Sequence, residues 1–324
     1  MKEMRFNQAV NEALDEEMAR DASVFIMGED IGEHWGGPFG QFRGLAEKYG
    51  TERVRDTPIS ETAILGGAIG AAATGMRPVA AMMFVDFLGV SGDELLNQLQ
   101  MRYMFGGKIK LPLTILATTG AGVSAAAQHS KSLYGWLANI QGLKTVAPST
   151  PADAKGLLKA AIREDNPVMF LTHKLLGGIA GQVPEGDHLV PIGKADIKRE
   201  GKDVTVVAVA MMVHRALAAA TKLQEKGISI EVIDPRTIVP FDKQAIIDSV
   251  KKTGRLVILD EEPKTGSWAS EVAATVVEEA FDYLDAPIKR VCAPDTPIPF
   301  SPVLERFWIP GEEALIKAVE EVKG

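Results

Sequence analysis

The chain has 324 residues, of which 46% are hydrophobic and 24% charged, and its net charge is -8. This length is enough for about two domains with substantial cores, and the composition is that of a globular protein, which excludes a disordered chain. The negative charge argues against a nucleic-acid binder, because there is no basic surplus to neutralise phosphates. Cys292 is the only cysteine, which excludes an internal disulfide and fits a reducing compartment.

The N-terminal sequence does not have the pattern of a signal peptide. It is amphipathic and acidic, and it reads M-K-E-M-R-F-N-Q-A-V-N-E-A-L-D-E-E-M. No apolar run in the chain reaches the roughly 20 residues needed to span a bilayer. We therefore expect a cytoplasmic protein that binds neither a membrane nor nucleic acid.

The first half of the chain alternates short apolar runs with segments of helical periodicity. Helices are predicted at 7–19, after Ser60 up to residue 77, at 92–104 and at 151–163, and strands at 24–27, 78–84, 111–117, 143–146 and 168–171. Such alternation predicts a parallel sheet that is covered by helices on both faces.

Residues 177–193 contain glycine, proline and charges without a hydrophobic period, and we place the domain linker there. The alternation then restarts, with strands predicted at 204–210, 228–233, 256–259 and 288–291 and helices at 214–226, 242–252, 267–281 and 312–322. The predicted fold class is α/β, with two doubly wound domains at residues 1–180 and 181–324.

The stretch 56–77 predicts a buried helix with an acid at its start, and it reads D-T-P-I-S-E-T-A-I-L-G-G-A-I-G-A-A-A-T-G-M-R. Glycines lower helix stability, so Gly66, Gly67 and Gly70 indicate that backbone approaches something closely here. Glu61 has two interpretations. It is either a first-turn acid that interacts with the helix dipole, or a carboxyl whose pKa an apolar pocket raises so that it exchanges protons near neutral pH.

Other polar groups lie where strands or loops end. The acids of G-E-D-I-G at 28–32 follow a predicted strand and face a crevice if the sheet is parallel. His129 lies where a small, polar loop meets a predicted helix; an imidazole there can move protons at pH 7, although a lone histidine is often a packed or surface residue. Spaced His or Cys ligands, a P-loop, a G-x-S-x-G turn and a G-x-G-x-x-G turn are all missing, so no transition-metal site is expected.

With these residues set out, the chain resembles, nearly end to end, the beta subunit of the thiamine-diphosphate-dependent decarboxylase component of 2-oxo acid dehydrogenase complexes, and the related acetoin dehydrogenases. The matching stretches, in chain order, are G-E-D-I-G, D-T-P-I-S-E, A-Q-H-S, G-L-K-T-V-A-P, A-I-R-E-D-N-P, D-P-R-T-I-V-P-F-D and P-D-T-P-I-P-F. The resemblance implies a transketolase-like pyrimidine-binding domain followed by a transketolase C-terminal-like domain.

The resemblance also implies roles for individual residues in the binding of thiamine diphosphate. Glu61 matches the carboxyl that hydrogen-bonds the ring nitrogen of the aminopyrimidine, and Glu29 matches an acid that orients this site. Met83 and Phe87 match residues that line the pyrimidine pocket; their apolar cluster is also compatible with a simple core strand. His129 matches a histidine implicated in proton transfer and in acyl transfer to a lipoyl group.

A structural potassium site is a further implication of the resemblance. It is built largely from backbone carbonyls, and the matching residues are Leu113, Ala161, Ile162, Glu164 and Asn166. Glu164 stands where Asp is common in the family.

The chain contains no Gly-Asp-Gly segment with a downstream Asn, which thiamine enzymes use to hold Mg²⁺ and the diphosphate. The resemblance therefore implies half a site, completed by an alpha subunit that holds the Mg²⁺. The expected assembly is an α2β2 heterotetramer with the cofactor between chains, docked on a dihydrolipoyl acyltransferase core.

The substrate is a small molecule, and departures from the family pattern favour a neutral one. The strand before the active-site loop reads L-T-I-L-A-T-T-G-A-G without the Arg of many 2-oxo acid enzymes, and Lys131 replaces a frequent Gln. Because a neutral substrate needs no cation for a carboxylate, acetoin is preferred and pyruvate comes next. The alternatives are a branched-chain 2-oxo acid enzyme, half of a split transketolase or deoxyxylulose-phosphate synthase, and a non-catalytic scaffold.

Overall fold

The computed structural model describes all residues, Met1–Gly324, and the chain forms two compact units. Unit 1 comprises Met1–Thr119 and Ile140–Ile192, and unit 2 comprises Gly120–Asn139 and Gly193–Gly324. The segment Gly120–Asn139 thus belongs to unit 2, although unit 1 precedes and follows it in the sequence. None of the helices combines the length and apolar character that a bilayer crossing requires.

Unit 1 is built around a parallel sheet in the order β6-β7-β5-β4-β2-β3. Its strands are β2 (Val24–Gly28), β3 (Val54–Asp56), β4 (Arg77–Phe84), β5 (Thr114–Thr119), β6 (Lys144–Val146) and β7 (Val168–His173). A separate antiparallel pair joins β1 (Lys2–Arg5) to β8 (Ala180–Val183). The central strands are buried along almost their whole length, which explains their continuous apolar runs.

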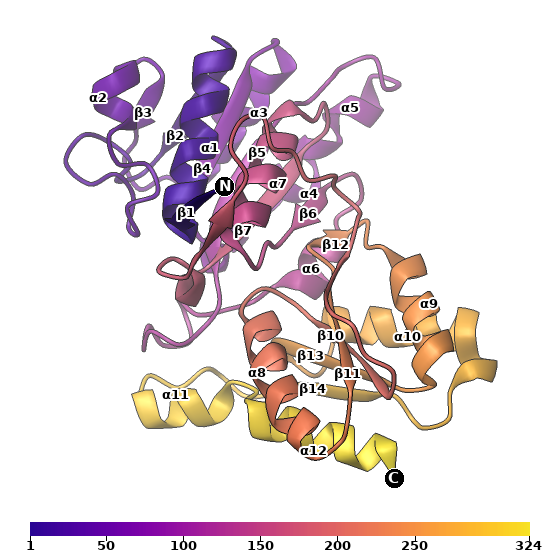
Figure 1. Ribbon diagram of the computed structural model, residues 1–324. Helices are drawn as coiled ribbons and strands as arrows, with labels where there is room; N and C mark the ends of the chain where they lie inside the picture. Colours follow the sequence, from indigo (N-terminus) through magenta and orange to yellow (C-terminus); the bar gives the residue numbers. More distant parts are fainter. The chain divides into compact units, whose positions relative to one another are not determined.

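Helices of unit 1 cover this sheet (Figure 1). They are α1 (Phe6–Arg20), α2 (Leu45–Tyr49), α3 (Glu61–Ala73), α4 (Gly92–Leu96), α5 (Met101–Met104) and α7 (Pro151–Arg163), with short turns η1 (Val85–Gly89), η2 (Gln98–Gln100) and η3 (Lys174–Leu176). The start of α7 follows from its sequence: Pro151 occupies the first turn, and Thr150 Oγ1 accepts a hydrogen bond from the Asp153 N–H at 3.1 Å.

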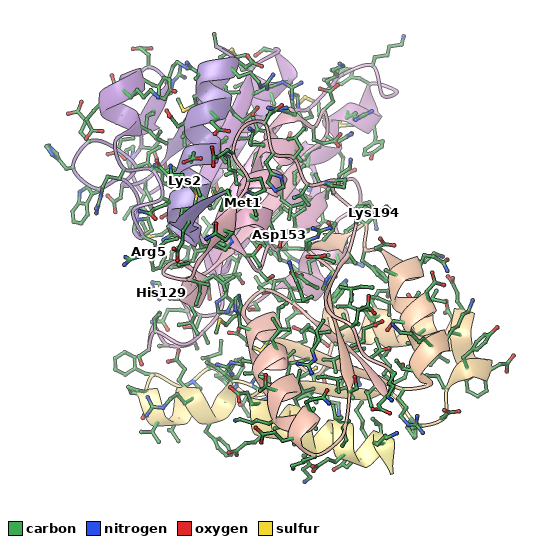
Figure 2. All side chains as sticks on the ribbon, in the orientation of Figure 1. Met1, Lys2, Arg5, His129, Asp153 and Lys194 are labelled. Carbon is green, nitrogen blue, oxygen red and sulfur yellow. The ribbon has the colours of Figure 1, made fainter.

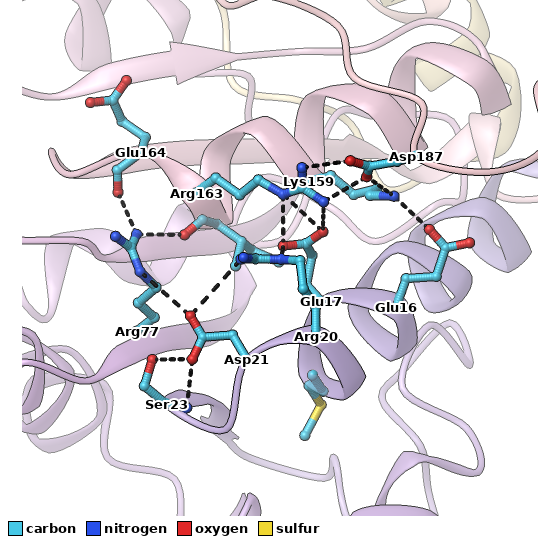
Figure 3. Close-up of polar contacts among 12 residues, drawn as sticks. Glu16, Glu17, Arg20, Asp21, Ser23, Arg77, Lys159, Arg163, Glu164 and Asp187 are labelled. Carbon is cyan, nitrogen blue, oxygen red and sulfur yellow. Dashed lines mark hydrogen bonds and ion pairs between the residues drawn. The ribbon is translucent and has the colours of Figure 1, made fainter.

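Charged side chains join α1 to α7 (Figure 3). The buried carboxylate of Glu17 accepts hydrogen bonds from Arg163 at 2.6 to 3.1 Å, and Arg163 also bonds to Asp187. Lys159 bridges Glu16 and Asp187 at 2.6 and 2.8 Å. The guanidinium of Arg163 holds the pKa of Asp187 well below its usual range.

Unit 2 contains a second, mainly parallel sheet in the order β14-β13-β10-β11-β9. Its strands are β9 (Asp196–Arg199), β10 (Val204–Ala208), β11 (Ile230–Asp234), β13 (Leu256–Pro263) and β14 (Lys289–Ala293), and a short β12 (Thr237–Val239) lies outside this sheet. The edge strand β9 runs antiparallel to β11, while the other strands of this sheet are parallel.

The helices of unit 2 are α6 (Tyr134–Ala138), α8 (Met211–Glu225), α9 (Lys243–Thr253), α10 (Trp268–Ala280), α11 (Pro302–Trp308) and α12 (Glu312–Lys323), with the turn η4 (Phe281–Tyr283). α8 packs against α12, and α9 packs against α10, on either side of the sheet (Figure 1). Asp242 Oδ1 accepts a hydrogen bond from Ala245 N to cap α9, and Gly254, with φ of 70°, ends it as the sequence predicted.

Two segments differ from their predictions. The helix expected at 92–104 is divided into α4, η2 and α5. At the division, the side-chain amides Asn97 Nδ2 and Gln98 Nε2 donate to the Asp93 carboxylate at 2.6 and 3.0 Å. The segment 177–193, where we placed the domain linker, contains the strand β8, whose short sequence gives no strand signal.

The helix α3 begins at Glu61 as predicted, but it is buried on one face only. Ile64, Leu65, Ala68, Ile69 and Ala72 point into unit 1, whereas Thr62, Ala63, Gly67 and Gly70 are exposed. A Cβ at Gly70 would meet no atom within 4 Å, and one at Gly66 or Gly67 would make ordinary contacts at 3.6 and 3.4 Å. The prediction that these glycines allow close approach was therefore wrong within this chain.

Ser60 occupies the N-cap position of α3 without capping it. Its Oγ donates to the Pro58 carbonyl at 2.9 Å rather than accepting from the first turn. The start of the helix therefore depends on its apolar face more than on a side-chain cap.

Candidate functional site

Acidic residues meet at the carboxyl edge of the unit 1 sheet. β2 lies between β3 and β4, with Gly28 paired to Asp56 on one side and to Ala81 on the other. Glu29 follows β2 directly, and Glu61 begins α3 shortly after β3. Because parallel strands end at the same edge of a sheet, this topology places both glutamates at the carboxyl edge of the unit 1 sheet.

The turn after β2 is fixed by backbone hydrogen bonds. Asp56 Oδ1 accepts from Ile31 N at 2.9 Å, and the Gly28 carbonyl accepts from Thr57 N at 2.9 Å. Asp30 adopts a left-handed conformation with φ of 55°, which an aspartate tolerates better than most residues. Sequence reasoning did not identify Asp56 as a part of this site, although it ends the strand next to β2.

Glu29 is almost fully buried, and its Oε2 has no hydrogen-bond partner. The pKa of Glu29 is raised, mainly by burial and further by the negative charges of Glu61, Asp30 and Asp56. The charge of Glu61 contributes to this shift after burial, which indicates that the two carboxyls lie near each other. A buried oxygen without a partner requires a donor, and a nitrogen-rich ring bound beside these acids would supply one.

An apolar wall lies beside the acids at the end of β4. Met83 is the second-last residue of that strand, and Phe87 follows in η1; both are half-buried. The Phe87 ring meets Phe84 edge-on at 5.8 Å, and Phe84 meets Phe39 at 6.1 Å. β4 pairs with β2 in the sheet, so Met83 and Phe87 follow the paired residue Ala81 at the same carboxyl edge at which Glu29 follows Gly28.

The residues of the predicted potassium site lie elsewhere, at the amino ends of β5 and β7. Arg77 donates from Nη1 to the carbonyls of Ile162 and Glu164 at 3.0 and 3.1 Å. The Ala161 carbonyl accepts from Glu164 N, and the Leu113 carbonyl accepts from Val168 N.

The Glu164 side chain at this edge is also engaged. It pairs with Lys144 at 2.6 Å and accepts from Asn166 Nδ2 at 2.7 Å. Each carbonyl keeps a second lone pair, but the Arg77 guanidinium already brings positive charge to two of them, so the donors fit an alkali cation only in part.

His129 lies in the segment Gly120–Asn139 of unit 2 (Figure 2). Its backbone N–H donates to Ala126 O at 3.4 Å, and Lys131 Nζ donates to Ala127 O at 2.6 Å. His129 and the acids Glu29 and Glu61 therefore belong to different units of the fold, and the sequence alone gave no indication of this division.

Unit 2 also contains buried acids that sequence reasoning missed. Asp260, Glu261 and Glu262 end β13, and Glu305 lies in α11, all at 5% exposure or less. Burial is the main cause that raises the pKa of Asp260 to about 6, and hydrogen bonds from backbone N–H groups partly oppose it. Three acids directly after an apolar strand are a signal that the sequence did offer.

Comparisons with known proteins agree with this architecture. Residues 2–178 match the transketolase pyrimidine binding domain, and residues 193–315 match the transketolase C-terminal domain. A solved structure described as a split gene transketolase, inactive beta4 tetramer, superposes with a TM-score of 0.82 over 99% of this chain and 98% of its own, at 24% identity, which supports the fold alone.

Similar sequences extend over almost the whole chain. The acetoin:2,6-dichlorophenolindophenol oxidoreductase subunit beta of Bacillus subtilis is 49% identical over 98% of this chain and 96% of its own. The 2-oxoisovalerate dehydrogenase subunit beta of the same organism is 46% identical over 99% of both chains, and the mitochondrial pyruvate dehydrogenase E1 component subunit beta-2 of Oryza sativa is 44% identical over 98% of this chain and 86% of its own. The chain therefore belongs to the family of beta subunits of acetoin and 2-oxo acid dehydrogenases, built from a transketolase pyrimidine-binding domain and a transketolase C-terminal domain.

Proposed function

We propose that this chain is the beta subunit of a thiamine-diphosphate-dependent acetoin dehydrogenase, with pyruvate as the next candidate substrate. The reaction would break the carbon-carbon bond of acetoin, release acetaldehyde and transfer the acetyl group to oxidised lipoamide, whose disulfide is reduced. The observation that carries the proposal is the buried Glu29 at the carboxyl edge of the sheet, whose Oε2 has no hydrogen-bond partner and whose pKa is raised by burial and by the charge of Glu61.

Bound thiamine diphosphate would supply the nucleophilic carbon and accept electrons from the broken bond. The residues of this chain would orient it and control its protons. Glu61 would hold a proton at a ring nitrogen, Glu29 would orient the ring end of the site, and Met83 and Phe87 would exclude water from the ring faces. His129 would move a proton and assist the transfer of the acyl group to the lipoyl sulfur.

The diphosphate and Mg²⁺ would be held by an alpha subunit in an α2β2 heterotetramer, docked on a dihydrolipoyl acyltransferase core in the cytoplasm. All three relatives described above are named as beta subunits, which supports an alpha subunit as the partner. Thiamine diphosphate should therefore bind tightly to the mixed chains and weakly to either chain alone, which isothermal titration would measure. Tight binding to this chain alone would contradict a shared site.

Substitution of Glu61 tests the catalytic role directly. In the α plus β enzyme, Glu61→Gln should lower turnover by about 10²-fold or more, because a neutral amide does not exchange the proton, while the heterotetramer still forms. Glu47→Gln, an exposed glutamate on α2, is the matched control and should leave turnover unchanged. Full activity of Glu61→Gln would instead support a scaffold without catalysis.

The substrate is tested by steady-state assays of the same enzyme with acetoin, pyruvate and branched-chain 2-oxo acids. The acetoin relative at 49% identity supports acetoin, but the branched-chain relative at 46% is close behind. The expected result is the highest kcat/KM for acetoin. No turnover of acetoin would overturn this preference.

A monovalent cation at the carbonyls of Leu113, Ala161, Ile162, Glu164 and Asn166 is part of the same proposal. The negative end of the α7 dipole supports a cation here. Potassium should raise the melting temperature relative to tetramethylammonium. An unchanged melting temperature would mean that the Arg77 guanidinium is the only cation that these carbonyls need.

A further inference from the structure

The backbone that leads to His129 is bound by a buried glutamate from a distant part of the chain. Glu305, on α11, accepts hydrogen bonds from Gly122 N and Ser124 N, both at 2.8 Å, one on each carboxylate oxygen. The second oxygen also lies 3.3 Å from Ser124 Oγ. Both carboxylate oxygens of Glu305 therefore accept hydrogen bonds from one turn, which ends five residues before His129.

Two glutamates of β13 bind the same segment at other points. Glu261 Oε1 accepts from Ala121 N at 2.5 Å. Glu262 accepts from Gly135 N at 3.0 and 3.1 Å, and also from Trp268 N at 2.8 Å. The segment is therefore held on both sides of His129 by carboxylates of unit 2.

The bound turn has a conformation that needs such support. Ser124 and Ala126 have φ of 57° and 59°, a left-handed conformation that residues with a Cβ rarely adopt, and Gly120 and Gly122 also have positive φ. The loop is closed by a hydrogen bond from Gly120 N to Lys131 O at 3.0 Å. The carboxylates of Glu261 and Glu305 stabilise this conformation, because they accept hydrogen bonds from its backbone N–H groups.

We call the hydrogen bonds from Glu305 and Glu261 to the backbone of residues 121–124 the clamp. The chemistry of these two side chains shows that they do more than fill space. Glu305 and Glu261 are each only 2% exposed, and burial of a carboxylate is unfavourable unless hydrogen bonds satisfy it. Here the donors are backbone N–H groups of the His129 segment, and charge-assisted bonds of this kind are roughly twice as strong as neutral ones. An apolar side chain at position 305 would fill the same space but leave these N–H groups unpaired.

We propose that Glu305 is a positioning residue for His129: its carboxylate fixes the left-handed turn at residues 122–124 and thereby sets where the imidazole stands. This inference rests on the proposed function for its catalytic consequence, but the clamp itself is a property of unit 2. Glu261 acts at the preceding residue, and Glu262 holds the far end of the segment.

Amide hydrogen exchange of the α plus β enzyme tests the clamp. In Glu305→Gln, one carboxylate oxygen becomes an NH₂ group that faces an N–H donor, so exchange of peptides from residues 120–131 should quicken about tenfold. Glu231→Gln is the matched control, because Glu231 is a buried carboxylate of the same unit that bonds to Gly201 N and Lys252 but not to this segment. Exchange at 120–131 should be unchanged in this control.

Kinetics of the same variants separate positioning from general loss of structure. For Glu305→Gln we expect kcat to fall about tenfold, with KM and the Kd for thiamine diphosphate within twofold of the original values, and Glu305→Asp should recover part of the loss. Equal falls in Glu305→Gln and Glu231→Gln would overturn the proposal.

The exchange and kinetic results also distinguish this inference from the proposed function. Unchanged exchange at 120–131 in Glu305→Gln would overturn the clamp whatever the enzyme's substrate. If the unaltered enzyme turned over neither acetoin nor any 2-oxo acid, the proposed function would fail, while faster exchange in Glu305→Gln would still support the clamp.

Discussion

A methyl group at Gly28 would lie 2.4 Å from the carbonyl oxygen of Ala81 and 2.8 Å from its Cβ. The obstruction is backbone, which cannot move without disturbing the pairing of β2 with β4. Glycine at this position therefore lets β2, which leads directly to Glu29, run close to β4. The sequence showed the glycine, but only the register of two distant strands shows what it avoids.

Gly28→Ala should lower the free energy of unfolding by about 2–3 kcal/mol, because overpacking forces the two strands apart. Urea denaturation would measure this loss. Gly89→Ala is the control, since a Cβ there meets no atom within 4 Å and the change should stay within about 0.5 kcal/mol. Equal effects at both positions would contradict the steric argument.

At the scale of elements, the pairing of α1 with α7 depends on charges with little access to water. Lys155 and Lys159 have side-chain exposures of 1% and 3%, and both pair with Glu16, at 2.7 and 2.6 Å. Periodicity predicted both helices, and α7 at its observed bounds, but it did not predict this pairing, because the partners are far apart in sequence.

Glu16→Ala should destabilise the protein by about 1–3 kcal/mol, since it removes a partner from two buried ammonium groups. The loss is smaller than for a fully buried pair, because the Glu16 side chain is one-third exposed to water. Glu320→Ala breaks the exposed pair with Lys226 and should change the unfolding free energy by less than about 1 kcal/mol. Chemical denaturation of the two variants provides the comparison, and a larger loss for Glu320→Ala would refute the explanation.

The exposed glycine face of α3 gives a second element-scale prediction. Gly70→Ala should stabilise the isolated chain by about 0.5–1 kcal/mol, because a Cβ there meets nothing and alanine favours the helix. If the glycine face of α3 packs against the alpha subunit in the proposed heterotetramer, the same methyl group should lower the affinity for that subunit by about tenfold. Thermal melts of the chain and titration with the alpha subunit would measure the two effects; unchanged affinity would show that this face stays free.

At the scale of the whole molecule, the two units should respond differently to acid. The pKa of Asp187 in unit 1 is lowered by Arg163, so this pair stabilises the fold above the ordinary aspartate pKa and loses its effect as pH falls below it. Asp260 in unit 2 has the opposite sign, because burial raises its pKa to about 6. Its folded form binds a proton more readily than its unfolded form, so stability from this group rises as pH falls from 7 towards 4.

Asp260→Asn should therefore flatten the gain in unfolding free energy between pH 7 and pH 5. The difference between a pKa of about 6 and the ordinary 3.8 corresponds to on the order of 3 kcal/mol over the full range. Urea unfolding at the two pH values would measure the slope, with the exposed Asp248→Asn as the control. A slope that is the same in Asp260→Asn and the parent would rule out Asp260 as its source.

The sequence by itself determined the α/β class, the family and most of the helices and central strands, because local periodicity encodes an amphipathic helix or a buried strand without reference to distant residues. It missed seven short elements, whose sequences carry little signal until partners bury them: β1, β3, β8, β9, β12, α2 and α11.

Only the tertiary structure decided which residues far apart in the sequence lie close together. It put Glu29 close enough to Glu61 for their charges to interact, assigned the segment of His129 to unit 2, and brought Glu305 to Gly122 and Ser124 across more than 180 residues of chain. Such contacts depend on strand order, register and the burial of side chains, and these follow from packing over the whole chain rather than from any local pattern.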